Sequence, residues 1–326
     1  MAPGYGKQSL EEISLLEPTP KDYRSGFVAL IGRPNVGKST LVNQLVGEKV
    51  AITSPVAQTT RNRLRAILTT PKAQLVMVDT PGIHKPHHLL GERLVQSAKM
   101  TIGEVDVVLL LLEACNMPGK GDSFIVKLLN QQKIPVLVAL NKSDLVQEVD
   151  YLRREREYRS LVSESGWPIY RCSAVNGEGC NALIEGLIDY LPVSPHLYPS
   201  HMVSDQPERV LLSELIREQV LLQTREEVPH SVAVTIDRLE EIIADKTKKK
   251  SQGYTAILAS ILVERKSQKG ILIGKGGSML KTIGQGARLQ MQVLIDGPVY
   301  LELFVKVVPD WRSKPARLAE LGYGVN

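Results

Sequence analysis

In the first half of the chain, short runs of apolar residues alternate with segments of helical pattern. Residues 27–31 form the first run, and a glycine-rich turn and a helical pattern up to Gly47 follow it. Uninterrupted apolar strands that alternate with helices are typical of a mostly parallel sheet with helices on both faces. The pattern therefore predicts an α/β domain over residues 26–191. Its further strands are expected at 75–78, 107–112, 135–140 and 169–172, and its further helices at about 89–102, 121–132, 149–165 and 179–190.

One strand of this domain is expected to run against the others. Residues 65–70 come just before the strand at 75–78, and only a short turn with Pro71 separates the two. Strands joined by so short a turn pair antiparallel, because a parallel pair needs a long crossover connection. The hairpin therefore predicts one antiparallel strand at the edge of the sheet.

The second half of the chain has a different order of elements. A helix is expected at about 208–223, and the alternation of apolar and polar residues at 231–237 predicts a half-buried strand. The order of these and the later elements is α-β-β-α-α-β, which predicts a separate α+β domain over residues 208–326. The later elements are a strand at about 255–264, a glycine-rich element at 270–277, a helix through Leu280, Ile283 and Ala287, and a strand at 299–307.

Two stretches differ in composition from both domains. Residues 1–25 are rich in proline, glycine and charged residues, and we expect a flexible N-terminal extension there. Residues 192–207 contain four prolines, a composition that favours extended backbone. This second stretch is therefore expected to be a linker between the domains.

The composition fits a globular protein of about two domains. The chain has 326 residues, 43% of them hydrophobic and 23% charged, which excludes collagen-like, disordered and disulfide-rich chains. Its three cysteines form no CxxC pair, so reduced thiols and a cytoplasmic protein are expected. The longest purely apolar run has six residues, and a membrane-spanning helix needs roughly 20. Residues 1–24 contain three glutamates and no apolar stretch, so no signal peptide is expected.

The segment 32–40 matches the GxxxxGK[ST] pattern of phosphate-binding loops, directly after a strand and before a helix. Its glycines let backbone N–H groups wrap around phosphates at the N-terminus of the helix. We expect Lys38 to reach the β- and γ-phosphates and the Ser39 hydroxyl to bind Mg²⁺. The residues expected to contact the nucleotide here are Gly32, Arg33, Pro34, Asn35, Val36, Gly37, Lys38, Ser39 and Thr40.

The sequence NKSD at 141–144, which follows a predicted strand, indicates that the base is guanine. The Asp144 carboxylate can accept hydrogen bonds from N1–H and from the exocyclic amine of guanine, whereas adenine has no donor at N1. Sites that depend on such pairing reject the wrong ligand by roughly 10⁴–10⁵. The residues expected to form the guanine site are Asn141, Lys142, Asp144, Ser173 and Ala174.

Two further segments are expected to respond to the γ-phosphate. The sequence DTPG at 79–82 follows a strand, so we expect Asp79 to hold Mg²⁺ and the Gly82 amide to sense the γ-phosphate. In the sequence QTTR at 58–61, we expect Thr60 to close over Mg²⁺ and the γ-phosphate and to release after hydrolysis. The predicted metal ligands are thus Ser39, Thr60 and Asp79, with Lys38 and Thr60 as catalytic residues.

Hydrolysis is expected to be slow without help from another group or ion. The residue after DTPG is Ile83, and many switch GTPases have a water-orienting glutamine at this position. An isoleucine side chain cannot orient a water molecule by hydrogen bonding. The neighbouring His84 is expected to be a solvated loop residue.

The sequence GKGG at 274–277 fits a GxxG turn between two helices. In KH domains such a turn lets a nucleic-acid backbone approach main-chain N–H groups. Residues 246–281 contain nine Lys and Arg and one acidic residue, a net charge of +8, whereas the rest of the chain carries −3. Phosphate contacts in such a stretch make binding weaken with salt. The residues expected to contact RNA are Lys269, Ile273, Gly274, Lys275, Gly276, Gly277 and Lys281.

In combination these motifs resemble the Era family of bacterial ribosome-assembly GTPases over about residues 25–323. The resemblance implies a P-loop GTPase domain followed by a type II KH domain, with GTP or GDP and Mg²⁺ as ligands. It also implies a monomer that binds 16S ribosomal RNA near its 3′ end, acts in maturation of the 30S subunit and associates peripherally with the inner membrane. The stretches that carry it are GRPNVGKST at 32–40, AQTTR at 57–61, DTPG at 79–82, NKSD at 141–144, LVER at 262–265 and residues 273–284.

The resemblance also bears on the missing glutamine. The family belongs to GTPases with a hydrophobic residue at the position of Ile83. In related enzymes an asparagine of the phosphate loop helps to bind K⁺, which supplies positive charge at the transition state. The resemblance therefore implies Asn35 as a further catalytic residue and K⁺ as a further cofactor.

The residues alone leave two other functions open. One is a non-enzymatic RNA-binding module in which the nucleotide is only structural. The other is a switch GTPase whose second domain binds a polypeptide. The basic stretch around the GxxG turn favours RNA over a polypeptide partner.

Overall fold

The computed structural model describes residues 19–56, 59–61, 63–83, 89–243 and 253–323. Their contacts divide the chain into two compact units. The expected loop residue His84, the lysine run at 246–250 and residues 1–18 of the expected extension lie outside the described residues. The first unit contains Met1–Val50, Arg63–Thr80 and Lys99–Asp205, and the second contains Ala51–Asn62, Pro81–Ala98 and Gln206–Asn326.

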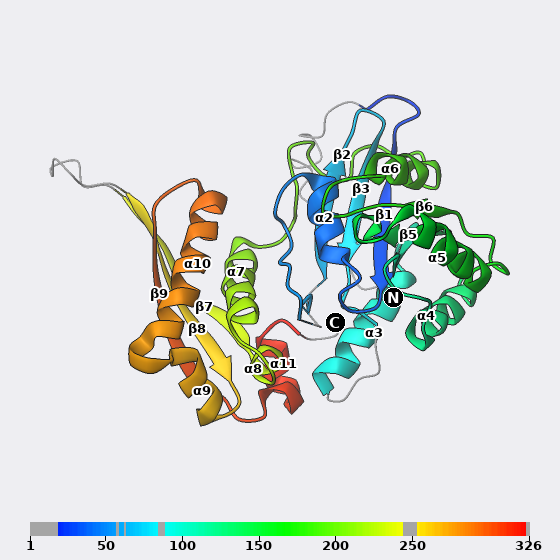
Figure 1. The fold of residues 1–326 in the computed structure, drawn as a ribbon. Helices are drawn as coiled ribbons and strands as arrows, with labels where there is room; N and C mark the ends of the chain where they lie inside the picture. The colour runs from blue at the N-terminus through cyan, green and yellow to red at the C-terminus, as the bar shows by residue number, and fades with distance from the viewer. Residues whose placement is uncertain (1–18, 57–58, 62, 84–88, 244–252, 324–326) are drawn as a thin grey trace. The chain divides into compact units, whose positions relative to one another are not determined.

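The first unit is built on a six-stranded sheet in the order β2-β3-β1-β4-β5-β6 (Figure 1). Strand β2 is antiparallel to β3 and the other neighbouring pairs are parallel, which confirms the predicted hairpin and its edge strand. Nearly every residue of the central strands is buried, as expected for a sheet covered on both faces. The strands are β1 (Arg24–Gly32), β2 (Leu64–Thr69), β3 (Ala73–Asp79), β4 (Val107–Glu113), β5 (Val136–Asn141) and β6 (Ile169–Arg171).

The helices of the first half lie where the periodicity predicts them, and their ends differ by at most four residues. Strands β1, β3 and β5 end at Gly32, Asp79 and Asn141, so each runs directly into one of the motif loops. The carboxyl ends of parallel strands meet at one edge of a sheet, which brings these loops together. The elements are α2 (Lys38–Val46), α3 (Leu89–Ile102), α4 (Lys120–Asn130), η1 (Ser143–Leu145), α5 (Glu148–Leu161) and α6 (Cys180–Asp189).

The two stretches of distinct composition differ from the prediction. The expected extension ends earlier, because β1 begins at Arg24 and pairs there with β3. The expected linker lies along the hairpin up to Asp205: the N–H of Ile67 donates to the carbonyl of Val203 at 2.9 Å. Edge strand β2 has N–H and C=O groups that no further strand pairs, and the extended backbone of this proline-rich stretch supplies partners for them.

A buried glutamine fixes this stretch to the sheet. Gln74 of β3 is fully buried, and its side-chain oxygen accepts hydrogen bonds from the N–H groups of Leu197 at 2.7 Å and Tyr198 at 2.9 Å. Its amide nitrogen donates to the carbonyl of Tyr198 at 2.8 Å. Since a buried amide is costly without partners, Gln74 makes the docked position of residues 197–198 specific.

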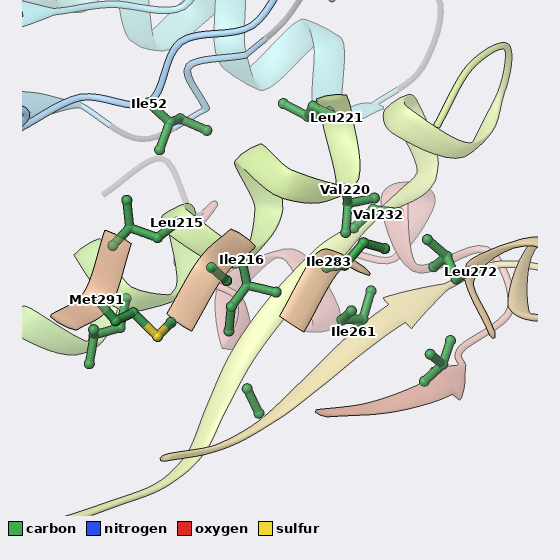
Figure 2. Packing of buried hydrophobic residues seen from close by; sticks show 14 of the residues in the cluster. Ile52, Leu215, Ile216, Val220, Leu221, Val232, Ile261, Leu272, Ile283 and Met291 are labelled. Atoms are coloured by element: carbon green, nitrogen blue, oxygen red, sulfur yellow. The ribbon is translucent and has the colours of Figure 1, made fainter. Parts of the chain in front are cut away.

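The second unit contains the predicted α-β-β-α-α-β order. Its three-stranded sheet has the order β7-β8-β9, with β7 antiparallel and β9 parallel to β8. Helices α7 and α10 pack on this sheet through a single hydrophobic core (Figure 2). A short helix α8 and the elements η3 and α11 were not predicted. The elements are α7 (Glu208–Gln223), α8 (Val228–Ser231), β7 (Ala233–Ile242), β8 (Tyr254–Val263), α9 (Lys266–Ile273), η2 (Lys275–Gly277), α10 (Ser278–Ile295), β9 (Val299–Val307), η3 (Trp311–Ser313) and α11 (Pro315–Glu320).

The second unit also holds two segments from the first half of the sequence, 51–62 and 81–98. Ile52 is 6% exposed and belongs to the same hydrophobic core as Leu215 and Ile216 of α7 (Figure 2). The predicted first domain, 26–191, includes both segments. The periodicity could not assign them elsewhere, because their partners lie more than a hundred residues further along the chain.

Two expectations from composition can be compared with the structure. Among the described residues, no helix has the length and apolarity to cross a membrane. Cys115, Cys172 and Cys180 are free thiols, and the last two are buried. Burial raises the pKa of the Cys172 thiol to about 12, so this thiol stays protonated at neutral pH.

Candidate functional site

The phosphate loop joins the end of β1 to the start of α2. Gly37 has a φ of 98°, and a Cβ atom there would lie 2.4 Å from the amide nitrogen of Asn141. A Cβ atom at Gly32 would lie 2.7 Å from the carbonyl oxygen of Leu111. Both positions therefore require glycine. Gly37 precedes α2 without a side-chain cap, so the first N–H groups of the helix are available to an anion.

The amine of Lys38 lies inside this loop. Its side chain is 6% exposed, and its Nζ donates to the carbonyl oxygens of Arg33 at 2.9 Å and Gly32 at 3.4 Å. Burial lowers its pKa to about 8, and the nearby Asp79 carboxylate opposes that shift. A bound phosphate group would bring a further negative charge close to this buried amine and so favour its charged form. The loop therefore fits a polyphosphate ligand.

Two of the three predicted metal ligands are in contact. The Ser39 hydroxyl at the start of α2 donates to Oδ2 of Asp79 at 2.7 Å, and Asp79 is fully buried at the end of β3. A hydroxyl and a carboxylate are the hard oxygen donors that Mg²⁺ prefers, so this pair fits the ion. The third predicted ligand, Thr60, and the predicted sensor Gly82 belong to the second unit.

The guanine site is formed by the loops after β5 and β6. Asp144 is exposed in η1, and one of its carboxylate oxygens accepts a hydrogen bond from the Ser173 hydroxyl at 2.5 Å. This bond orients the carboxylate, whose two oxygens can still accept further hydrogen bonds from a ligand. Ser173 and Ala174 are themselves buried. The structure therefore brings the predicted base-contacting residues together.

The first two residues of the NKSD sequence join loops to one another. The Asn141 amide donates to the carbonyl of Val36 in the phosphate loop at 2.8 Å, and its oxygen accepts from the N–H of Ala174 at 2.9 Å. The Lys142 amine donates to the carbonyl of Asn35 at 2.7 Å. Asn141 and Lys142 thus fix the spacing between the phosphate and guanine subsites.

Sequence reasoning missed two acidic residues that anchor this region. The Arg33 guanidinium forms an ion pair with the buried Asp122 of α4, with 2.8 Å between Nε and Oδ1. Glu113, at the end of β4, pairs with both Lys142 and Arg33. Among the described residues, the side chain of Arg33 is therefore engaged by Asp122 and Glu113 and not by a phosphate-site residue. In the sequence, only the position of Glu113 at the end of a predicted strand could have indicated that it belongs to the site.

The remaining predicted nucleotide-site residues surround these contacts. Val36 is fully buried beneath the loop, whereas Pro34 and Thr40 are half-buried and Asn35 is exposed with a φ of 64°. Ile83, in the second unit, is 2% exposed. The hydrophobic residue at the usual glutamine position is therefore a buried side chain.

The predicted RNA-binding residues lie on and around one turn of the second unit, where Lys275, Gly276 and Lys281 are exposed but Ile273 is half-buried against the hydrophobic core. Gly274 ends α9 with a φ of 72°, and a Cβ atom there would lie 2.8 Å from the backbone nitrogen of Met279. Gly276 and Gly277 also have positive φ, but a Cβ atom on either would meet no atom within 4 Å. The turn is therefore closely packed at Gly274, whereas the space beside Gly276 and Gly277 is open. Lys269, Ile273, Lys275 and Lys281 lie on this turn and its flanking helices.

Family models match both halves of the chain. A model of the 50S ribosome-binding GTPase family matches residues 27–142, and a KH domain model matches residues 227–312. A protein named GTPase Era from Nostoc sp. is 57% identical over 314 residues, which cover 96% of this chain and 94% of that relative. GTPase Era of Rippkaea orientalis is 53% identical over 96% of both chains.

Two solved structures are similar over most of the chain. One is Era in complex with MgGDPNP and nucleotides 1506–1542 of 16S ribosomal RNA, with 38% identity and a TM-score of 0.87. The other is a variant of Aquifex aeolicus Era bound to GDP·AlF₄⁻, with 37% identity and a TM-score of 0.86. Each match covers 93% of this chain and 100% of the other.

The guanine site predicts a change of base preference in Asp144→Asn. The amide loses the charged acceptor, so the Kd for GTP should rise about 10²-fold or more. Xanthine carries a carbonyl where guanine has its amine, and the new amide can donate to it, so XTP should bind the variant better than GTP. Competition with a fluorescent nucleotide measures both constants. Asp150→Asn, an exposed position on α5, is the control and should keep the native preference. An unchanged affinity for GTP in Asp144→Asn would contradict the site.

Proposed function

The chain belongs to the Era family of GTPases, and from that premise we propose that its KH domain binds 16S ribosomal RNA near the 3′ end during maturation of the 30S subunit. GTP hydrolysis follows from the family itself. The RNA-binding part is supported by the similar Era complex, which contains nucleotides 1506–1542 of that RNA. The observation that carries it in this chain is the open GxxG turn at 274–277. We further propose that hydrolysis of GTP acts as a timer that changes how the KH domain is presented.

Positioning and electrostatics, rather than a protein nucleophile, carry the hydrolysis in this proposal. Backbone N–H groups of the loop at 32–40, in which Pro34 has none, hold the phosphates, and the buried Lys38 amine supplies positive charge to the β- and γ-phosphates. Ser39, Asp79 and Thr60 would hold Mg²⁺, which neutralises charge on the phosphate oxygens when bound. Gly82 would respond to the γ-phosphate through its backbone N–H.

Base selection in this proposal depends on the Asp144 carboxylate, with Ser173 and Ala174 completing the guanine site. The Ser173 hydroxyl already occupies one oxygen of that carboxylate. Adenine has no donor at N1 and would leave the carboxylate without this partner, which explains a preference for guanine.

We also propose K⁺ as an activating ion, with Asn35 as the residue that helps to bind it. Ile83 is buried and apolar, so it cannot orient the attacking water, and another positive group is needed at the phosphates. GTP turnover should therefore be faster in K⁺ than in Na⁺ at equal ionic strength, and Asn35→Ala should remove the difference. Equal turnover of the native chain in the two salts would contradict this role.

The partner in this proposal is the 30S subunit, and the chain acts as a monomer in the cytoplasm. Peripheral association with the inner membrane is implied by the family resemblance alone. Co-sedimentation with 30S subunits and flotation with inner-membrane vesicles test these two associations separately. Binding to neither would restrict the partner to the RNA.

The RNA proposal predicts a loss of affinity when Lys275→Asp and Gly276→Asp are combined. Aspartate tolerates the positive φ at Gly276, so the turn should persist while its charge reverses. The Kd for a 37-nucleotide RNA corresponding to positions 1506–1542 should rise at least about tenfold, because each lost phosphate contact weakens binding. Fluorescence anisotropy of labelled RNA measures it.

The control for this experiment makes the same change of charge elsewhere. Gln132→Asp combined with Lys133→Asp alters two exposed residues beyond α4 in the first unit. This variant should keep the native RNA affinity within about twofold. If the GxxG variant binds as tightly as the control, RNA does not bind at this turn.

A further inference from the structure

The segment that contains Thr60 is held by the unit that contains the KH domain. Ile52 lies in the hydrophobic core of that unit, and the N–H of Thr53 donates to the carboxylate of Glu218 at 2.8 Å. Glu218 is 1% exposed and also accepts a hydrogen bond from the amide of Gln290 in α10. The start of the segment is therefore joined through one buried carboxylate to two helices of the second unit, α7 and α10.

Both neighbours of Thr60 are anchored in the same unit. The carbonyl of Thr59 accepts a hydrogen bond from the guanidinium of Arg217, which is fully buried in α7. Arg61 is 4% exposed, and its guanidinium donates to three backbone carbonyls around α8 at 2.5–3.3 Å. Those carbonyls belong to Pro229, His230 and Val232.

The C-terminal end of the chain completes the environment of Arg61. The guanidinium carbon lies 5.9 Å from the ring centroids of both Trp311 and Tyr323, within the range of a cation–π contact. These two rings form a second hydrophobic cluster with Leu90 and Leu94 of α3. The residues around 311–323 therefore contact both the Thr60 segment and the helix that follows Gly82.

Arg61 cannot leave this position without a large cost. Burial lowers the pKa of its guanidinium, and no carboxylate forms an ion pair with it among the described residues. Three carbonyls and two aromatic faces lie against the charge instead, with a smaller electrostatic contribution from the Glu214 carboxylate. The carbonyls of Pro229 and Val232 would lose this donor if Arg61 withdrew, whereas that of His230 also accepts from Arg312.

These anchors restrict Thr60 itself. Consecutive Cα atoms are 3.8 Å apart, so a residue between two fixed neighbours can move only a few ångströms. Any larger movement of Thr60 toward or away from a bound nucleotide must displace the contacts of Thr59 and Arg61. A change at Thr60 is therefore transmitted to α7, α8 and the C-terminal cluster.

We propose that Arg61 is a positioning residue that couples Thr60 to the KH domain, through the carbonyls of 229, 230 and 232 and the rings of Trp311 and Tyr323. This inference rests on the proposed function, because it requires both GTP-dependent placement of Thr60 and RNA binding. Its consequence is that RNA affinity depends on the nucleotide. By linkage, RNA must change the relative affinities for GTP and GDP by the same factor.

The test compares the Kd for the 37-nucleotide RNA with Mg²⁺ and GDPNP against the Kd with Mg²⁺ and GDP. In the native chain the two constants should differ by about 5–150-fold, the usual range of allosteric coupling. Arg61→Met introduces an unbranched apolar side chain that can still fill part of the site but has no hydrogen-bond donor. In this variant the two constants should agree within about twofold.

The matched control is Arg63→Met, two residues further along the chain. Arg63 forms an ion pair with Glu104, and both residues belong to the first unit. This variant should keep the native ratio. Tyr323→Leu removes only one of the two rings beside Arg61 and lies beyond the matched KH range, so it should lower the ratio part of the way.

Each outcome decides between the two proposals. A native ratio of one, or a native ratio retained in both Arg61→Met and Tyr323→Leu, overturns the coupling role of Arg61. If Arg61→Met is already unfolded at the temperature of the assay, the ratio measured for Tyr323→Leu alone decides whether Arg61 has a coupling role. Failure of the native chain to bind the RNA with either nucleotide would instead overturn the proposed function.

Discussion

Two of the hydrogen bonds of the Asn141 side chain hold the nucleotide site together. One reaches the carbonyl of Val36 beside the phosphate loop, and the other accepts from the N–H of Ala174 beside the guanine site. The amide is almost fully buried, so each lost partner would leave a buried polar group that costs about 1–3 kcal/mol. The distance between phosphate and base subsites is thereby fixed before a nucleotide arrives, which reduces the entropy lost on binding. Gly37 must lack a side chain because this amide occupies the space.

In the second unit, too, buried polar groups need hydrogen-bond partners, and here these partners hold the segment around Thr60. Buried charges in its core are compensated by hydrogen bonds: backbone carbonyls accept from Arg61, and the Glu218 carboxylate accepts from the N–H of Thr53 and the amide of Gln290. Because those partners come from distant parts of the sequence, the segment around Thr60 folds with the KH domain rather than with its neighbours in the chain.

Local patterns predicted the strands, the motif loops and the GxxG turn, because each depends on residues that are adjacent in sequence. The hairpin and the edge position of β2 also followed from a short turn. The docking of residues 192–205 did not, because it depends on Gln74, more than a hundred residues earlier. Nor did the environment of Arg61, whose carbonyl partners lie some 170 residues away and whose burial has no signature in a polar QTTR sequence. Pairing of buried polar groups over such distances is decided by tertiary packing and not by periodicity.

The central claim is that the first unit hydrolyses GTP at a site built on Lys38 and selects the base through Asp144. Its most direct test is steady-state phosphate release by the native chain and by Lys38→Ala, with GTP and with ATP, in the presence of Mg²⁺ and K⁺. The account predicts multiple turnovers with GTP, release from ATP lower by roughly 10⁴-fold, and no release by Lys38→Ala. Equal release from GTP and ATP, or undiminished release by the variant, would contradict it.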